Sequence, residues 1–252
     1  MSKNKKLVSV IMPYYKKKNY FIRSFNSAYN QSYIPLEIII IYDDTEKEEL
    51  FFIKKFLKGK KKRNIKILIN RKNYGAGISR NKGIKFSKGA YIAFLDCDDY
   101  WKKSKIKKQV DFMKKNSYCA THTSYKIFDS ASKNQIIRTA KKKLSFSDLV
   151  NSCDIGLSTV VLKRSIIKKN MRFPNLKTKE DYVMWLKISK KYIFYGIDSV
   201  LTTWLKVNDS LSSKLIQKLL DGYLVYRKFL KYSAYKSLIR LLILSINFLK
   251  KN

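Results

Sequence analysis

Carboxylates are scarce in this chain, which has 18 Asp and Glu against 55 Lys and Arg and a formal net charge of +37 over 252 residues. It also has few Pro, Gly and Cys residues: 3, 8 and 3. So few Pro and Gly leave no room for a long flexible linker. The cysteines, Cys97, Cys119 and Cys153, are odd in number and widely spaced. They support neither a disulfide framework nor a Cys-based metal cage, and they fit a reducing cytoplasm.

The apolar content indicates that the positive charge coats a folded body. Hydrophobic residues make up 45% of the chain and aromatic residues 14%, well above the content of a disordered basic tail. At ~150 residues per domain, the length predicts one compact body. Only nine of the basic residues are Arg, the residue that nucleic-acid readers favour. The Lys excess therefore favours a solvated surface, with a nucleic-acid-binding module as the alternative.

Apolar runs that alternate with helical periodicities predict an α/β fold. Short apolar runs typical of strands cover residues 7–12, 37–42, 65–69 and 90–95. Apolar residues at three- and four-residue spacings predict helices over residues 20–29, 46–57 and 76–86. Continuous apolar strands are buried on both faces, so we expect a Rossmann-like, mostly parallel sheet flanked by helices. Ligands of such sheets bind beyond the carboxyl ends of the strands.

The second half of the sequence predicts a mixed arrangement of helices and strands. We expect helices over residues 103–115 and 180–191 and strands over residues 121–128, 136–139 and 158–162, followed by helices over residues 215–230 and 237–249. The last helix is too short for the ~20 apolar residues of a membrane span, and Arg240 and Asn247 interrupt it. With its basic flanks it suits an anionic membrane surface. Packing on the body of the protein is the alternative.

Three tight acidic clusters stand out against the lysines: Asp43-Asp44, Asp96-Cys97-Asp98-Asp99 and Glu180-Asp181. The first two follow predicted strands, and all three can meet at one edge of the sheet. Asp96 and Asp98 are two residues apart, so an extended strand end projects both carboxylates to one side. Mg²⁺ or Mn²⁺ is commonly held by one or two carboxylates and the oxygens of a diphosphate. The alternative for each cluster is an acidic turn or the first turn of a helix.

A glycine-rich segment, residues 73–83, is the other concentrated signal. Three of the eight glycines, Gly75, Gly77 and Gly83, fall within it. Glycine lets the backbone approach a ligand closely, and the segment leads into a helix whose N-terminus favours anions. The pattern lacks the dinucleotide-binding spacing, so a simple helix-entry turn is the alternative.

These segments, in this order, resemble a family 2 glycosyltransferase of the GT-A fold. The matching segments are residues 8–15, Asp43-Asp44, residues 75–83, residues 89–99 and residues 179–187. Residues 158–161 and 208–214 also resemble the branch that builds teichuronic acid, capsule and lipopolysaccharide chains. The resemblance implies a glycosyltransferase domain over residues 1–205, with a nucleotide-sugar-binding half (1–100) and an acceptor half (101–205). Residues 206–252 would form a C-terminal helical extension.

The resemblance also implies roles for residues at the nucleotide end. Tyr15 is expected along the base, Asp44 is expected to hydrogen-bond the base, and Asp96 is expected to contact the ribose. Arg80 is expected to face the nucleotide, with a position on the helix surface as the alternative. The expected donor is a nucleotide sugar, with a UDP-sugar favoured, and the expected acceptor is a saccharide or lipid-linked saccharide. No nucleic acid is expected as a partner.

For the metal and the chemistry, the resemblance implies Mn²⁺ or Mg²⁺ on Asp98 and inverting transfer with Asp181 as general base. Glu180 is expected to orient Asp181 or the acceptor. A nucleotidyltransferase is a further alternative, but its phosphate-binding basic signature is poorly matched near the N-terminus. The one histidine, His122, is expected to be structural. Of the three tryptophans, at 101, 185 and 204, at least two are expected in the core.

Overall fold

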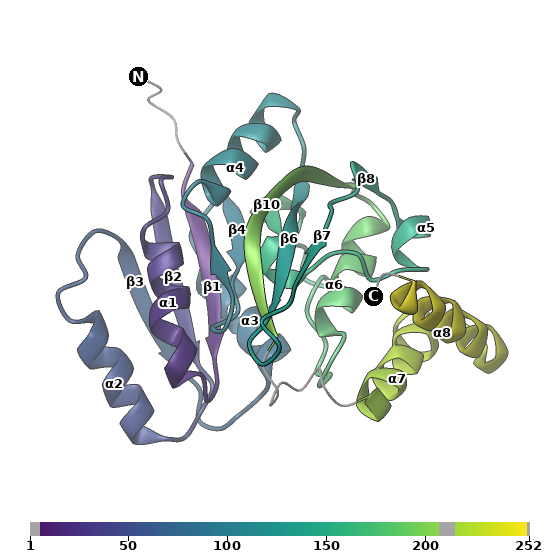
Figure 1. Ribbon diagram of the computed structural model, residues 1–252, viewed down its shortest axis with the longest axis horizontal. Helices are drawn as coiled ribbons and strands as arrows, with labels where there is room; N and C mark the ends of the chain where they lie inside the picture. The colour runs from purple at the N-terminus through teal and green to yellow at the C-terminus, as the bar shows by residue number, and fades with distance from the viewer. Residues whose placement is uncertain (1–5, 207–214, 251–252) are drawn as a thin grey trace.

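A computed structural model of the chain describes residues 6–206 and 215–250. Within these residues, one mixed sheet of ten strands carries helices on both faces (Figure 1). The strands are β1 (Val8–Tyr14), β2 (Leu36–Tyr42), β3 (Asn64–Ile69), β4 (Tyr91–Phe94), β5 (Tyr100–Trp101), β6 (Ala120–Asp129), β7 (Gln135–Arg138), β8 (Lys143–Leu144), β9 (Val161–Lys163) and β10 (Phe194–Lys206). The α/β class predicted from the sequence is confirmed.

The helices follow the predicted alternation in the first half of the chain. They are α1 (Lys18–Tyr29), α2 (Lys47–Leu57), α3 (Ala76–Phe86), α4 (Lys105–Lys115), α5 (Phe146–Leu149), α6 (Glu180–Ser189), α7 (Leu215–Leu224) and α8 (Ala234–Leu249). Strands β3, β2, β1 and β4 lie side by side in that order and are parallel. Their carboxyl ends therefore share one edge of the sheet, as the alternation of strands and helices requires.

The central strands are buried on both faces because their side chains alternate between two hydrophobic cores. Val10 and Met12 of β1 belong to the core that includes side chains of α1, α2 and α4. Ile11, between them, belongs to the core that includes side chains of α6 and receives Ile84 of α3. Successive apolar side chains of the strand are therefore buried in one core and then the other. For this reason the strand has no polar face.

The strands in the second half of the chain form both parallel and antiparallel pairs, which confirms the predicted mixed arrangement. Strand β9 lies antiparallel between β4 and β6, and β10 pairs parallel with β6 and antiparallel with β5. The strand predicted over residues 158–162 was partly wrong, because residues 157–159 form a 3-10 turn before β9. Strand β10 was missed. Gly196 and Asp198 interrupt its apolar pattern, and its register against β6 shifts between Ile197 and Val200.

The C-terminal helices lie together at one side of the molecule, next to α5 and α6 (Figure 1). The helix predicted over residues 215–230 changes character after Leu224, where a π-helical segment, Val225–Phe229, begins. Helix α8 starts earlier than predicted, because the Ser233 side chain accepts a hydrogen bond from the Lys236 amide at 3.3 Å and caps it. Among residues 6–206 and 215–250, none of the helices is long and apolar enough to cross a bilayer.

Helix α3 lies so close to the sheet that a glycine is required at the contact. An ideal Cβ added to Gly83 would lie 2.6 Å from Ile11 Cγ2 and 2.9 Å from Ile41 Cδ1. Both distances are shorter than a carbon–carbon contact of ~3.5 Å. Gly83 therefore sets the separation between α3 and strands β1 and β2.

We expect Gly83→Ala to lower the free energy of unfolding by about 1–3 kcal/mol, because the new methyl group overpacks the core. In an ordinary helix interior the same change stabilises by about 1 kcal/mol, so the sign is diagnostic. Urea unfolding followed by circular dichroism measures the difference. Lys85→Ala, on the exposed side of the same helix, is the control and should stay within about 0.5 kcal/mol of the wild type. A stabilised Gly83→Ala protein would contradict the close contact.

Candidate active site

The acidic clusters lie where the sheet topology predicts. Asp43 and Asp44 directly follow β2, and residues 96–99 follow β4, on either side of β1. The Asp43 amide donates to the Tyr14 carbonyl at 2.8 Å, which continues the β1–β2 ladder into the cluster. Two of the three clusters therefore emerge at the carboxyl edge of the parallel strands, the usual place for a ligand in such sheets.

Asp43 organises the glycine-rich segment. Its carboxylate accepts hydrogen bonds from the Tyr74 amide at 2.9 Å, the Gly75 amide at 2.8 Å and Asn70 Nδ2 at 2.7 Å. Gly75 has a φ of +87°, a conformation that glycine adopts without steric cost. The segment is thus a helix-entry turn built around a buried carboxylate, and it fixes where α3 begins.

Asp44 and Tyr15 have different environments. The Asp44 side chain is buried, and its Oδ1 accepts from the Thr45 amide at 2.8 Å. Its Oδ2 is buried too, and within the described part of the chain it has no hydrogen-bond partner. A buried carboxylate oxygen without a partner is costly unless a ligand completes it. Tyr15, just past the end of β1, is 41% exposed, so its ring is accessible to a planar ligand.

Arg80 is the centre of the site. Its Nη2 donates to Asp96 Oδ1 at 2.7 Å, and its Nη1 donates to Glu180 Oε1 at 2.6 Å. The guanidinium is buried and lies 5.6 Å from the centre of the Phe173 ring. Burial alone would lower the pKa of Arg80, but the two carboxylates raise it above its ordinary value. The helix-surface alternative for Arg80 was therefore wrong.

The acidic turn after β4 is held from several directions. Asp98 Oδ2 pairs with the Lys17 ammonium at 2.8 Å. Asp99 is buried, and its carboxylate accepts from Ser158 Oγ at 2.5 Å and from the Leu205 amide at 3.2 Å. Burial, and then the charges of Asp98 and Asp96, raise the pKa of Asp99 well above its usual range. Asp99 is thus part of the scaffold, while Asp96 and Asp98 keep their side chains partly exposed.

The donor set suits a hard divalent cation bound together with a phosphate ligand. In the described residues, no group of three or more His, Cys, Asp or Glu side chains could hold a metal by itself. Asp98 already binds one cation, the Lys17 ammonium. Burial and the nearby Asp96 charge raise the pKa of Asp98, and Lys17 opposes this rise. Mg²⁺ and Mn²⁺ sites of this kind use one or two carboxylates and complete their shell with water and phosphate oxygens.

Asp181 lies in the first turn of α6, next to Glu180. Its Oδ1 accepts a hydrogen bond from the Tyr182 amide at 2.7 Å. Burial, with the neighbouring Glu180 charge as the second cause, raises the pKa of Asp181 to about 7, and Arg80 opposes this rise. A carboxylate with this pKa is partly protonated at neutral pH and can accept a proton in a reaction. The preceding residue, Lys179, has a φ of +64°, so the chain turns sharply into the helix.

Two residues of the site were missed as participants. Lys17 is one lysine among many, and no local pattern marks it as the partner of Asp98, 81 positions away. In the sequence Ser158 is marked only by its place in a family-like segment, but its hydroxyl donates to Asp99 and accepts from the Asp96 amide at 3.2 Å. Its carbonyl also accepts from Trp101 Nε1 at 2.7 Å. The serine therefore joins the acidic turn to the second half of the sheet.

The remaining candidates are structural. His122 is buried on β6, and burial lowers its pKa to about 4, so it is neutral at pH 7. Trp101 and Trp185 are buried, each in one of the two cores, and Trp204 is half-buried. The predicted core position of at least two tryptophans is confirmed. The family-like segment over residues 208–214 lies outside the described residues.

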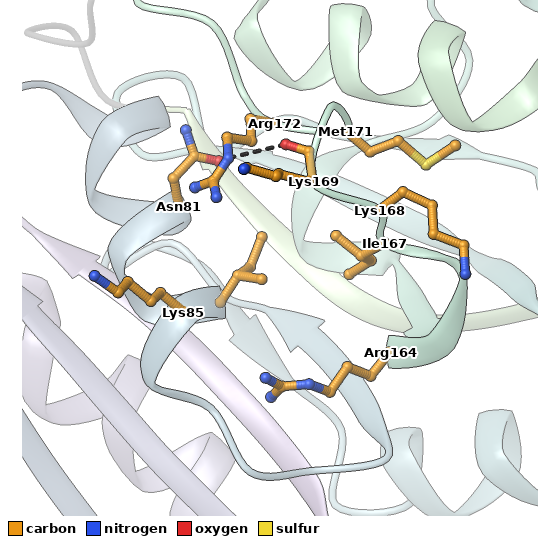
Figure 2. A pocket seen from close by; sticks show the side chains of 9 residues that line it. Asn81, Lys85, Arg164, Ile167, Lys168, Lys169, Met171 and Arg172 are labelled. Carbon is orange, nitrogen blue, oxygen red and sulfur yellow. Dashed lines mark hydrogen bonds between the residues drawn. The ribbon is translucent and has the colours of Figure 1, made fainter.

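A pocket of about 280 Å³ lies on the flank of α3 and is distinct from the acidic site. Figure 2 shows it between Asn81 and Lys85 of α3 and the segment from Arg164 to Arg172. Its charged lining residues are all basic: Lys85, Arg164, Lys168, Lys169 and Arg172. Arg164 already donates to Ser87 Oγ at 2.6 Å. Its lining includes none of the carboxylates that a proton transfer or a divalent metal requires.

Known proteins resemble this chain over most of its length. TuaG of Bacillus subtilis (strain 168), named as a glycosyltransferase of teichuronic acid biosynthesis, is 32% identical over 231 residues, or 90% of each chain. WfgD of Escherichia coli is 34% identical over 186 residues, or 73% of this chain and 70% of WfgD. It is named as a UDP-Glc:alpha-D-GlcNAc-diphosphoundecaprenol beta-1,3-glucosyltransferase.

Solved structures share the fold. S. aureus TarS 1-349 in complex with UDP-GlcNAc matches with a TM-score of 0.69 and 19% identity, over 93% of this chain and 70% of TarS 1-349. The mannosyltransferase PcManGT from Pyrobaculum calidifontis, in complex with GDP-Man and Mn²⁺, matches with a TM-score of 0.70 and 12% identity, over 96% of this chain and 70% of PcManGT.

The family assignment rests on sequence. Residues 9–171 match the model of glycosyl transferase family 2. This match favours the glycosyltransferase interpretation over the nucleic-acid-binding and nucleotidyltransferase alternatives. The chain belongs to glycosyl transferase family 2.

Proposed function

We propose that this enzyme transfers a sugar, with inversion, from a nucleoside diphosphate sugar to a hydroxyl group of a lipid-linked saccharide in cell-surface polysaccharide synthesis. The observation that carries the proposal is the Arg80 bridge. Arg80 contacts Asp96, on the turn after β4, and Glu180, the neighbour of Asp181, within 2.7 Å. A nucleotide-binding edge and a proton acceptor are thereby held in one site, which is the arrangement that sugar transfer requires.

Asp181 is the general base in this proposal. It takes the proton from the acceptor hydroxyl while the oxygen attacks the anomeric carbon of the donor. The new carbon–oxygen bond forms on the face opposite the departing diphosphate, whose bond to the anomeric carbon breaks. The nucleoside diphosphate leaves with both electrons of that bond, and the configuration at the anomeric carbon inverts. A pKa of about 7 suits Asp181 to accept this proton near neutral pH.

The nucleotide end uses the residues that follow β1, β2 and β4. The accessible ring of Tyr15 supports stacking along the base, and the unpartnered Oδ2 of Asp44 supports a hydrogen bond to it. The partly exposed Asp96 carboxylate would accept from the ribose, while Arg80 holds it in place. We assign residues 1–100 to the nucleotide-sugar half and residues 101–205 to the acceptor half of the transferase domain. Residues 206–252 are the C-terminal extension.

Asp98 is the proposed ligand of Mn²⁺ or Mg²⁺. When bound, the ion supplies positive charge that neutralises the diphosphate leaving group. PcManGT, which shares the fold, was solved with GDP-Man and Mn²⁺. In this chain Asp98 would exchange the Lys17 ammonium for the metal.

The names and ligands of the relatives support a choice of substrates. The printed name of WfgD gives UDP-Glc as donor and a diphosphoundecaprenol-linked sugar as acceptor, and TarS was solved with UDP-GlcNAc. We therefore propose a UDP-sugar donor and a lipid-linked acceptor for this enzyme. An acceptor anchored in a bilayer would bring the enzyme to the inner face of the cell membrane as a peripheral protein.

Asp181→Asn should lower kcat by roughly 100-fold or more while donor binding stays nearly unchanged, because the amide cannot accept the proton. Release of nucleoside diphosphate in the presence of acceptor gives kcat, and titration calorimetry with the nucleoside diphosphate gives affinity. Asp111→Asn, which changes an exposed acid on α4, is the matched control and should keep full activity. Normal turnover of Asp181→Asn would refute the assignment.

The pH dependence of kcat/KM should report the ionisation of Asp181. Because the base must be ionised, kcat/KM should rise with pH through about 7 and level off above it. Glu180→Gln removes the neighbouring charge that raises this pKa and frees Arg80 to lower it further, so the rise should move to lower pH. The position of the rise, measured from pH 5 to 9, is the readout. A rise that stays in place or moves upward in Glu180→Gln would contradict the role of Asp181.

Metal dependence should reside in Asp98. In the wild type, a UDP-sugar or UDP should bind more tightly with Mn²⁺ than with a chelator, and Asp98→Ala should abolish this difference. Titration calorimetry in both buffers measures it. Asp111→Ala, remote from the acidic turn, should retain the wild-type dependence. An undiminished Mn²⁺ effect in Asp98→Ala would show that another group binds the metal.

A further inference from the structure

Helix α8 has many of its large apolar side chains on the outside. Leu238 is 57% exposed and Leu242 is 61% exposed. Besides Phe248, the exposed large apolar residues of this helix are Tyr235, Leu238, Ile239, Leu242, Ile246 and Leu249. At 100° per residue these positions fall within one arc of about 100°. We call this set of six residues the outward stripe.

The inner side of α8 is held by polar contacts as well as by apolar packing. Arg240 Nη1 donates to Asn151 Oδ1 at 2.5 Å, and Asn247 Nδ2 donates to the Asn151 carbonyl at 2.9 Å. Ser237 and Leu244 are buried on the same side. The helix is thus anchored to the segment after α5, and its orientation leaves the outward stripe in solvent. A surface helix of a globular protein normally has a polar face toward solvent.

Helix α7 packs against α8 and adds to the same kind of surface. An ideal Cβ on Gly222 would lie 2.8 Å from Leu241 Cδ1, so the two helices are in close contact. Ile216 and Leu220 of α7 are 76% and 57% exposed. They are one turn apart on this helix. We call the two helices and the segment between them, residues 215–250, the α7–α8 hairpin. Both helices present large apolar side chains to solvent, and these are more numerous than scattered surface residues would explain.

The charge of the hairpin identifies the partner. Residues 215–250 contain seven basic residues and one acid. The basic residues are Lys218, Arg227, Lys228, Lys231, Lys236, Arg240 and Lys250. The acid, Asp221, is buried and accepts from the Thr178 amide and from Thr178 Oγ1, both at 2.8 Å. Two copies of this surface facing each other would bring like charges together, whereas an anionic bilayer offers opposite charge to the rim and apolar chains to the stripe.

We infer that the α7–α8 hairpin docks this enzyme on an anionic lipid bilayer, with the outward stripe among the acyl chains and the exposed basic residues at the phosphate headgroups. The inference rests on the proposed function only for the reason to be at a membrane. Thr178 precedes Asp181 by three positions, so the Asp221 contact ties the docking hairpin directly to the segment that carries the general base. Docking thereby fixes the active site close to the bilayer surface, where a lipid-linked acceptor is found.

Flotation with vesicles of phosphatidylglycerol and phosphatidylcholine tests the inference on the full chain. The wild type should float with these mixed vesicles and remain unbound with phosphatidylcholine alone. Leu238→Ser combined with Leu242→Ser should weaken partitioning at least about 10-fold, because two exposed leucines no longer enter the apolar phase. Phe51→Ser combined with Ile137→Ser is the matched control, since both residues are highly exposed but lie outside the hairpin, and it should float like the wild type.

Three results would overturn the inference. They are failure of the wild type to float, equal binding of the wild type to neutral and anionic vesicles, and flotation of the leucine variant at the wild-type level. A stable dimer in sedimentation velocity, dissolved by the leucine changes and indifferent to vesicles, would assign the stripe to a second copy instead. Hydrolysis of a UDP-sugar without vesicles should be equal in all variants. Hydrolysis without flotation would refute docking alone, and flotation without hydrolysis or transfer would refute the proposed function alone.

Discussion

The buried Arg80 guanidinium is the interaction on which the site depends. A buried cation is costly unless it is paired and hydrogen-bonded, and here Asp96 and Glu180 each accept from one terminal nitrogen. These three residues come from α3, from the turn after β4 and from the start of α6. Removing Arg80 would leave two neighbouring carboxylates without their shared donor, and removing either carboxylate would leave one terminal nitrogen of Arg80 without its acceptor, so the three segments have to keep their relative positions.

The position of Arg80 depends in turn on how α3 is set against the sheet. The Asp43 carboxylate fixes the entry to the helix through the Tyr74 and Gly75 amides, and Gly83 allows the helix to approach β1 and β2 closely. In the sequence Asp43 resembles a ligand-binding group, but its carboxylate accepts its hydrogen bonds from the protein itself. Its neighbour Asp44, with a buried oxygen left unpartnered among the described residues, is the one available to a ligand.

The sequence predicted the first half of the fold well, because uninterrupted apolar strands and periodic helices are local signals. It missed β10, where Gly196 and Asp198 break the pattern and the pairing with β6 determines the strand. The same limit applied to the site. The order of the strands predicted that the acidic residues would gather at one edge of the sheet. The pairing of Arg80 with Glu180 could not be predicted, because the two residues are 100 positions apart and no local pattern encodes their contact. The elevated pKa of Asp181 likewise arises from burial that only the assembled chain produces.

The Lys17–Asp98 pair makes cation binding at the acidic turn an exchange reaction. Any divalent ion that binds Asp98 has to displace a tethered ammonium group, whose local concentration is high and constant. A metal ion alone would have to compete with this ammonium, whereas an ion bound together with a diphosphate would give the displaced ammonium a new anion to contact. Metal and nucleotide would therefore bind with positive cooperativity, each raising the affinity for the other by the same factor. Once the diphosphate had left, Lys17 would be able to pair with Asp98 again.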